Sequence, residues 1–236
     1  MEPSISNVPK HLGIILDGNR RFSKRLMMKP WKGHEWGAKK VEAVLDWCKE
    51  YGIKETTFYA FSIENFDRPK KEFDFLMKLF EKEFRRMLSD ERLEKDKIKV
   101  NFIGRISMFP KNPHEVMEEL MEKTKDNDQL IVNFAMAYGG RAEIIDATKK
   151  ISQKIKEGKL DIDQINEETF SKSLYIESEP DLIIRTSESR LSGFLLWQGS
   201  YAEIIFLPNK LWPEFEKEDF IGCLNEYSRR QRRFGK

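Results

Sequence analysis

Short apolar runs alternate with longer amphipathic segments along most of the chain. That alternation is typical of repeated strand–helix units and predicts a largely parallel sheet. The apolar runs predict six strands, at residues 12–16, 56–61, 99–103, 130–135, 181–184 and 201–207.

The clearest helix begins after Pro69, where apolar residues recur at helical spacing on one face. They are Phe73, Leu76, Met77, Phe80, Phe84 and Leu88. Other helices are predicted from near Gly33 to a stop at Gly52, over 113–125, over 144–155 with a stop at Gly158, and over 217–230. The predicted fold class is α/β: a single domain with a central, largely parallel six-stranded sheet flanked by helices. No repeat, low-complexity segment or long linker divides the 236 residues.

Composition narrows the classes of partner and site. The chain has 42 Lys and Arg against 40 Asp and Glu, a formal charge of +2, which argues against nucleic acid as the main partner. Cys48, Cys223, His11, His34 and His114 lie far apart, so a disulfide framework, a zinc cluster and a Cys/His nucleophile are disfavoured. No apolar run is long enough to span a membrane and no signal pattern is visible, so we expect a cytoplasmic protein.

Polar side chains gather where three of the predicted strands end. They are Asp17, Gly18, Asn19, Arg20 and Arg21, then Ser62, Asn65 and Arg68, then Arg185, Glu188, Arg190 and Ser192. The carboxyl ends of parallel strands line one crevice, which is the usual ligand site of such folds. Arginine pairs with phosphate oxygens through two parallel hydrogen bonds, and Gly18 lets the backbone approach closely. The pattern predicts a phosphate site.

Asp17, a lone carboxylate among arginines, has two interpretations. It forms a buried ion pair with Arg185 or Arg68, or it holds Mg²⁺, which takes one or two carboxylates together with phosphate oxygens. The spacing alone favours the ion pair slightly.

Several motifs resemble the cis-prenyltransferases, the undecaprenyl diphosphate synthase family. They are HLGIILDGNRRF (11–22), YAFSIENFDR (59–68), RTSESRLSGFLLWQ (185–198), YAE (201–203), LWP (211–213) and RRFG (232–235). They occur in the family's order over nearly the whole chain, and DGNRRF is closer to the archaeal and eukaryotic branches. The resemblance implies an N-terminal extension at 1–10 and a cis-prenyltransferase catalytic domain at 11–236.

Family members add isopentenyl diphosphate units to an allylic diphosphate, forming cis double bonds. The resemblance implies that Asp17 and Asn65 are catalytic, with Asp17 and Glu203 holding Mg²⁺ and Glu203 acting within the chain or across a dimer interface. The implied allylic diphosphate site is Gly18, Asn19, Arg20, Arg21, Phe22, Lys29 and His34. Ser62, Ile63, Glu64, Phe66 and Arg68 match a mobile substrate loop, and Arg185, Arg190, Leu191 and Ser192 match the isopentenyl diphosphate site.

The resemblance also implies a homodimer, in which residues 233–235 reach into the partner's site, and an apolar tunnel for the product. Candidate tunnel walls are Phe73, Phe75, Leu76, Leu79 and Phe80, although each of them taken alone is more often ordinary core. The apolar helix face permits transient membrane contact, with the protein otherwise cytoplasmic. The basic run 229–233 fits a solvated helix end better than a nucleic-acid patch.

The sequence departs from the family pattern in ways that affect both substrates. Arg20 and Phe22 replace Gly and Trp of bacterial members, which leaves farnesyl and geranylgeranyl diphosphate open as primers, and Lys29 stands where many members have Arg. The segment 185–190 is one residue shorter than usual, with Ser189 and Gly193 in place of His and Asn. These changes motivate an alternative, an atypical prenyltransferase of the same fold with a different acceptor or a non-head-to-tail bond. A non-catalytic partner subunit and an unrelated phosphate-binding α/β protein are remoter alternatives.

Overall fold

A computed structural model describes residues 5–230, which form a six-stranded, all-parallel sheet in the order β3-β4-β2-β1-β5-β6. The strands are β1 (His11–Ile15), β2 (Glu55–Ser62), β3 (Ile98–Ile103), β4 (Leu130–Tyr138), β5 (Leu182–Thr186) and β6 (Glu203–Leu207). The predicted α/β class, the six strands and the parallel sheet are confirmed. The boundary at residue 10 stays a prediction.

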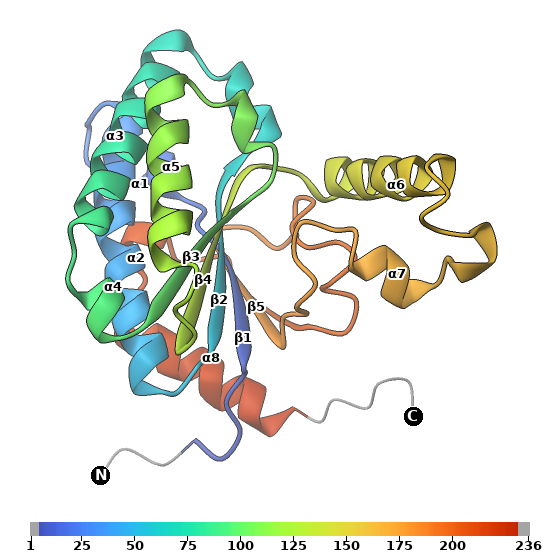
Figure 1. The fold of residues 1–236 in the computed structure, drawn as a ribbon. Helices are drawn as coiled ribbons and strands as arrows, with labels where there is room; N and C mark the ends of the chain where they lie inside the picture. Colours follow the sequence, from blue (N-terminus) through green and yellow to red (C-terminus); the bar gives the residue numbers. More distant parts are fainter. Residues whose placement is uncertain (1–4, 231–236) are drawn as a thin grey trace.

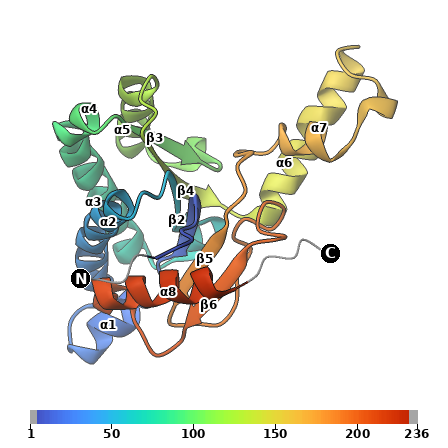
Figure 2. The same ribbon diagram turned by 90° about the horizontal axis from the view of Figure 1, so that it is seen from below.

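Helices flank this sheet, as Figure 1 shows. They are α1 (Asn19–Arg25), α2 (Gly33–Glu50), α3 (Lys70–Leu88), α4 (Arg92–Lys95), α5 (Lys111–Thr124), α6 (Gly140–Lys156), α7 (Glu167–Ser171) and α8 (Lys217–Arg229). Apolar residues of α2, α3, α5 and α8 join those of the strands in one large core. In both ribbon views α6 and α7 project from the rest of the molecule (Figure 2).

Helix α3 follows from its sequence because the apolar stripe after Pro69 gives it one buried face. Gly52, predicted to end the helix that begins at Gly33, has a φ of +74° just past the end of α2. Both predictions are confirmed.

Three features differ from the sequence prediction. Residues 19–25, for which no helix was predicted, form the short helix α1, because seven residues are too few to reveal helical periodicity. Arg185 lies inside β5 rather than after it. Strand β4 continues to Tyr138 because it is buried almost throughout and has no polar alternation to mark its end.

Candidate active site

The carboxyl ends of the central strands bring the three predicted polar groups together. Ile15 at the end of β1 lies opposite Tyr59 of β2 and Arg185 of β5, and Asp17 follows two residues later. Gly18 has a φ of +110°, and a Cβ there would lie 2.9 Å from the Leu211 Cα. Glycine is therefore required at this turn, both for its φ and for the close approach of the neighbouring chain.

The loop at Asp17 is held by residues from late in the chain. The Asp17 carbonyl oxygen accepts hydrogen bonds from the Trp212 backbone N–H (2.9 Å) and from the Thr186 hydroxyl (2.7 Å). The Trp212 indole N–H also donates to the Gly37 carbonyl oxygen on α2 (2.9 Å). The first motif is thus fixed between β5, α2 and the Leu211–Trp212 segment.

Asp17 pairs with two arginines. Its Oδ2 accepts a hydrogen bond from Arg185 Nη2 (2.8 Å), and its Oδ1 lies 3.4 Å from Arg21 Nη2. Of the two ion pairs considered from the sequence, the one with Arg185 forms and the one with Arg68 does not. The buried Arg185 Nε has no hydrogen-bond partner within the described residues, so the group keeps an unused donor.

Arg185 also closes the short segment that follows it. Its Nη1 donates to the Arg190 carbonyl oxygen and to the Ser192 hydroxyl (2.7 Å). Ser187 and Ser192 have φ values of 76° and 49°, a conformation costly for residues other than glycine and concentrated at functional sites. The Arg190 side chain pairs with Glu188 (2.6 Å) and is largely exposed, so it does not line the cavity beside Asp17.

A second polar group surrounds Glu72, a buried carboxylate on α3. It accepts a hydrogen bond from Arg68 Nη1 (2.7 Å) and lies 3.6 Å from Arg20 Nε. Sequence reasoning missed Glu72 because Arg68 was assigned to a phosphate. Helical spacing gave no signal, because Arg68 lies before the start of α3.

His34 lies against the same arginine. Its Nε2 is 3.3 Å from Arg68 Nη1, and since a guanidinium only donates, the imidazole accepts. Burial lowers the pKa of His34 to about 3, and the charges of Arg68 and Arg20 add to this effect. Burial likewise lowers the pKa of Arg68, while Glu72 opposes that change. His34 is therefore a neutral acceptor.

Ser62 and Asn65 form a hydrogen-bonded turn at the end of β2. The Ser62 N–H donates to Asn65 Oδ1 (3.1 Å), and the Ser62 side chain accepts from the Asn65 backbone in return. This reciprocal pair is a capping box, which fixes the orientation of the Asn65 amide at the start of the turn Ile63–Asp67.

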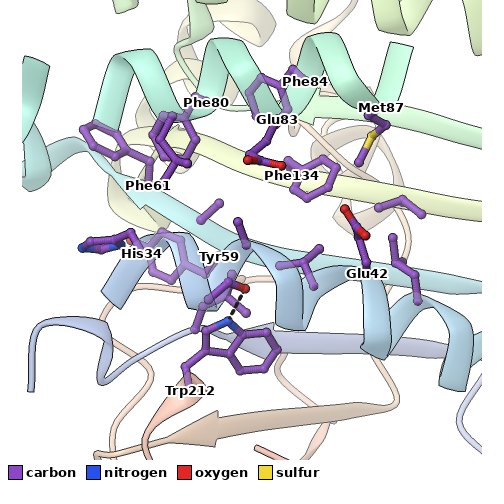
Figure 3. Close-up of a pocket in the computed structure, with 18 of the residues that line it drawn as sticks. His34, Glu42, Tyr59, Phe61, Phe80, Glu83, Phe84, Met87, Phe134 and Trp212 are labelled. Atoms are coloured by element: carbon purple, nitrogen blue, oxygen red, sulfur yellow. Dashed lines mark hydrogen bonds between the residues drawn. The ribbon is translucent and has the colours of Figure 1, made fainter. Parts of the chain in front are cut away.

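An apolar cavity of about 550 Å³ leads from this polar group between α2 and α3, and Figure 3 shows its walls. Predicted site residues that line it are Asp17, Asn19, His34, Ser62, Glu64, Asn65, Arg68, Arg185 and Ser192. Gly18, Arg20 and Arg21 line an adjoining polar hollow, together with Asp17 and Arg68.

Five other predicted site residues line neither space: Phe22, Lys29, Ile63, Phe66 and Leu191. The Phe22 ring packs beside Trp36, Lys29 lies over the Trp31 ring, and Phe66 packs on Phe61. Of the candidate tunnel walls, Leu76, Leu79 and Phe80 line the cavity. Phe73 packs against Phe61 and Phe66, and Phe75 against Trp31, so these two are not walls.

Glu203 lies at the opposite end of the sheet from Asp17, so the two cannot form one metal site within a single chain. It begins β6, opposite Leu182 at the amino end of β5, and pairs with Arg230 (2.8 Å). Asp17 lies beyond the carboxyl end of the sheet, and four residues of parallel strand already span about 13 Å. The sequence motif could not reveal this, because it does not show how β6 is aligned against β5. A role for Glu203 across a dimer interface stays a prediction, and residues 233–235 lie outside the described residues.

The family model described as putative undecaprenyl diphosphate synthase matches residues 15–235 of this chain. The chain belongs to this family, the cis-prenyltransferases. It is therefore an enzyme that transfers prenyl groups and makes a polyprenyl diphosphate, as its motifs predict.

Two archaeal relatives carry the name tritrans,polycis-undecaprenyl-diphosphate synthase (geranylgeranyl-diphosphate specific). The protein from Pyrococcus furiosus is 46% identical over 232 residues, which cover 97% of this chain and 88% of that protein. The protein from Thermoplasma volcanium is 48% identical over 231 residues, covering 97% and 89%.

Two solved structures are similar over almost their whole length. Lavandulyl diphosphate synthase from Lavandula x intermedia, in complex with dimethylallyl diphosphate, has a TM-score of 0.92 at 34% identity, covering 97% of this chain and 99% of that one. A probable undecaprenyl diphosphate synthase from Campylobacter jejuni has a TM-score of 0.80 at 36% identity, covering 98% and 100%.

Proposed function

We propose that this chain condenses isopentenyl diphosphate with an allylic diphosphate to make a polyprenyl diphosphate that serves as precursor of a lipid carrier. The observation that carries the proposal is the junction of an arginine-rich polar group with a deep apolar cavity. Such a junction suits an amphiphile with a diphosphate head and a prenyl tail. Of the two primers, geranylgeranyl diphosphate is favoured, because the archaeal relatives are named for it.

The allylic diphosphate is proposed to lie in the hollow at Gly18, Arg20 and Arg21, with its prenyl tail in the cavity. Arg68 and neutral His34 border both spaces. Each five-carbon unit buried in the cavity contributes on the order of 3–4 kcal/mol, at about 0.8 kcal/mol per CH₂. The growing tail is therefore drawn inward, toward Phe84 and Met87.

The isopentenyl diphosphate is proposed to bind at Arg185 and Ser192. The diphosphate that departs is that of the allylic substrate, so Arg20 and Arg21 in the adjoining hollow would stabilise the charge that develops on it. Asn65, held in place by Ser62, is proposed to assist removal of the proton from the new unit. The apolar cavity, once the prenyl tail fills it, excludes water from the reacting carbons.

Asp17 is the residue proposed to hold Mg²⁺. Within residues 5–230 no three His, Cys, Asp or Glu side chains cluster to form a metal site. Mg²⁺ fits here nonetheless, because it binds through one or two carboxylates together with substrate phosphates and water, and the Asp17 side chain is partly exposed. When bound, the ion supplies Lewis-acid neutralisation of the diphosphate.

A homodimer is proposed as the active form. Large apolar side chains are exposed on α6 and on the segment before β6, at Ile145, Leu196 and Tyr201. These residues fit a surface covered by a second copy, which would also let Glu203 act across the interface. Sedimentation equilibrium of the wild type and of Ile145→Asp tests this, and a wild-type monomer at micromolar concentration would contradict it.

A different acceptor remains the alternative, and one observation favours it. Arg190 pairs with Glu188 and does not line the cavity, so the acceptor site has one arginine fewer than its motif implies. An allylic substrate consumed without incorporation of isopentenyl diphosphate would establish this alternative.

The deciding experiment is a chain-length assay on purified protein with Mg²⁺ and labelled isopentenyl diphosphate. Farnesyl and geranylgeranyl diphosphate are supplied in parallel. We expect a ladder ending at one long product, faster from geranylgeranyl diphosphate, and lost in Asp17→Ala but kept in the surface control Asp163→Ala. No turnover with either primer would contradict the proposal and favour a non-catalytic partner subunit.

No membrane-crossing helix is present in residues 5–230. We propose a cytoplasmic enzyme with peripheral membrane contact.

A further inference from the structure

The end of α1 exposes apolar side chains that the fold does not use. Met27 is 95% exposed and Leu26 46%, and Trp36 on the first turn of α2 is 52% exposed. Buried Phe22 adjoins them, because its ring lies 5.8 Å from that of Trp36 and it precedes Leu26 by one helical turn. Figure 2 shows α1 at an outer corner of the molecule.

Met27 occupies a position where glycine would be easier. Its φ is 53°, and the bonds from Met27 N–H to the Lys24 carbonyl (3.1 Å) and from Met28 N–H to the Ser23 carbonyl (2.9 Å) form a Schellman motif. This motif usually has glycine at the left-handed residue, because a side chain is strained there. A strained residue with a fully exposed apolar side chain has no explanation inside the chain.

The surroundings of these apolar residues are basic. Residues 18–39, which include the whole of this surface, contain seven Lys and Arg and one acid, Glu35. Glu35 pairs with Lys32, and Arg25 pairs with Glu214. Within the described residues Lys24 and Lys39 are exposed and form no ion pair. Lys39 follows Trp36 by one helical turn on α2. Exposed Leu, Met and Trp among free lysines are typical of a surface that enters the headgroup region of an anionic bilayer.

We propose that Leu26, Met27 and Trp36, with Lys24 and Lys39, form a docking surface for membranes that carry anionic lipids. A second copy of the chain is disfavoured as occupant, because a twofold contact would place this basic surface against itself. The surface also continues into the site, since Lys24 lines the same polar hollow as Arg20 and Arg21. This inference rests on the proposed function: docking would hold the diphosphate site at the membrane, where prenyl tails are dissolved.

Vesicle flotation tests the proposal. The probes are vesicles of phosphatidylcholine alone and of phosphatidylcholine and phosphatidylglycerol in equal parts. We expect wild-type protein to float only with the anionic vesicles, and less so as salt rises. Leu26→Gln/Met27→Gly should bind about tenfold more weakly or worse, since two apolar side chains no longer leave water. Met27→Gly removes the backbone strain, so this variant should fold at least as well.

The matched control is Ile162→Gln/Ile165→Gln, which removes two exposed apolar side chains elsewhere and should bind like wild type. Equal binding to both vesicles, unchanged binding by Leu26→Gln/Met27→Gly, or equal loss in the control would overturn the proposal. Binding to polyglutamate but to neither vesicle would also overturn it and indicate an acidic protein partner. Prenyl transfer in detergent should be unchanged in Leu26→Gln/Met27→Gly, so failure of docking and failure of the proposed function are distinguishable.

Discussion

The cavity between α2 and α3 is charged at both ends, and the two ends differ in the sign of their excess charge. At the carboxyl edge of the sheet the cations outnumber the acids. Five cations, Arg20, Arg21, Lys24, Arg68 and Arg185, stand against four acids, Asp17, Glu64, Glu72 and Glu188. Because Arg185 also keeps a buried unpaired N–H, this end is arranged to receive an anion.

At the amino edge the acids are in excess. Lys49 pairs with Asp96 (2.6 Å), and Arg92 lies 2.6 Å from Asp90 and 3.7 Å from Asp46. These pairs join the end of α2 to the α3–α4 segment. The charges therefore favour a substrate that enters with its diphosphate at the carboxyl edge and its tail toward the amino edge.

The length of the cavity adds to this comparison. His34 and Lys49 on α2 both line it, and 15 residues of α helix span about 22 Å. An extended amino-acid residue, with three backbone bonds, spans about 3.5 Å. A prenyl unit has four chain bonds of similar geometry, so it extends by at most about 4–5 Å. About five extended units therefore reach the amino edge. Longer products must fold back or pass between the ion pairs there.

The largest difference is expected when an aspartate is replaced by asparagine at each end of the cavity in turn. Asp17→Asn should lower kcat by about a hundredfold or more, because charge stabilisation at the departing diphosphate is lost. Asp46→Asn, the matched change at the amino edge, should leave kcat within about twofold, since an exposed pair contributes little. Steady-state kinetics with thermal melting checks both, and an equal loss in the two variants would show that the ends do not differ.

The burial of His34, with Arg68 and Arg20 beside it, should appear in the pH dependence of stability. The folded protein keeps His34 neutral down to a pKa of about 3, whereas the unfolded chain takes up a proton near 6.5. The unfolded state binds more protons as pH falls, so stability is lost below pH 6.5. Between pH 7 and pH 5 this group should remove about 2 kcal/mol from the free energy of unfolding.

Denaturant unfolding at the two pH values measures that loss. His34→Asn should reduce the difference between pH 7 and pH 5 by about the same 2 kcal/mol. The partly exposed His114 on α5 provides the control, and His114→Asn should leave the difference close to wild type. An unchanged difference in His34→Asn would mean that His34 is not kept neutral by its surroundings.

The smallest effect is expected at the amino edge. Lys49→Met/Asp96→Leu replaces an ion pair by apolar side chains that border the cavity. Stability should change by less than about 1 kcal/mol, while the longest product should gain one or a few units, because an apolar edge accommodates a longer tail. Product chain lengths by mass spectrometry check this. A product distribution identical to wild type would show that the amino edge does not limit growth.

The sequence predicted the parts of the site that local pattern determines. Alternating apolar and amphipathic runs gave the parallel sheet, and the polar residues after each strand located the crevice. The Asp17–Arg185 pair was among the alternatives, but choosing it required the register of β1 against β5.

Other parts depend on tertiary placement that no local pattern carries. The stripe on α3 identified a buried face, yet not that Leu76 lines the cavity while Phe73 packs on Phe61 and Phe66. Glu203 was placed with Asp17 because motif order does not show which end of a strand a residue occupies. Exposure of Met27 was not anticipated, because the short helix α1 that ends just before it was not predicted.

The clamp on Asp17 by Trp212 has a consequence for biosynthesis. The loop at Asp17 is synthesised well before the residues that hold it, since Thr186 follows it by 169 positions and Trp212 lies later still. Contacts so distant in sequence form slowly and only after the intervening chain is available. A nascent or truncated chain that lacks Trp212 therefore has no formed diphosphate site, and activity requires this later segment to be present and folded.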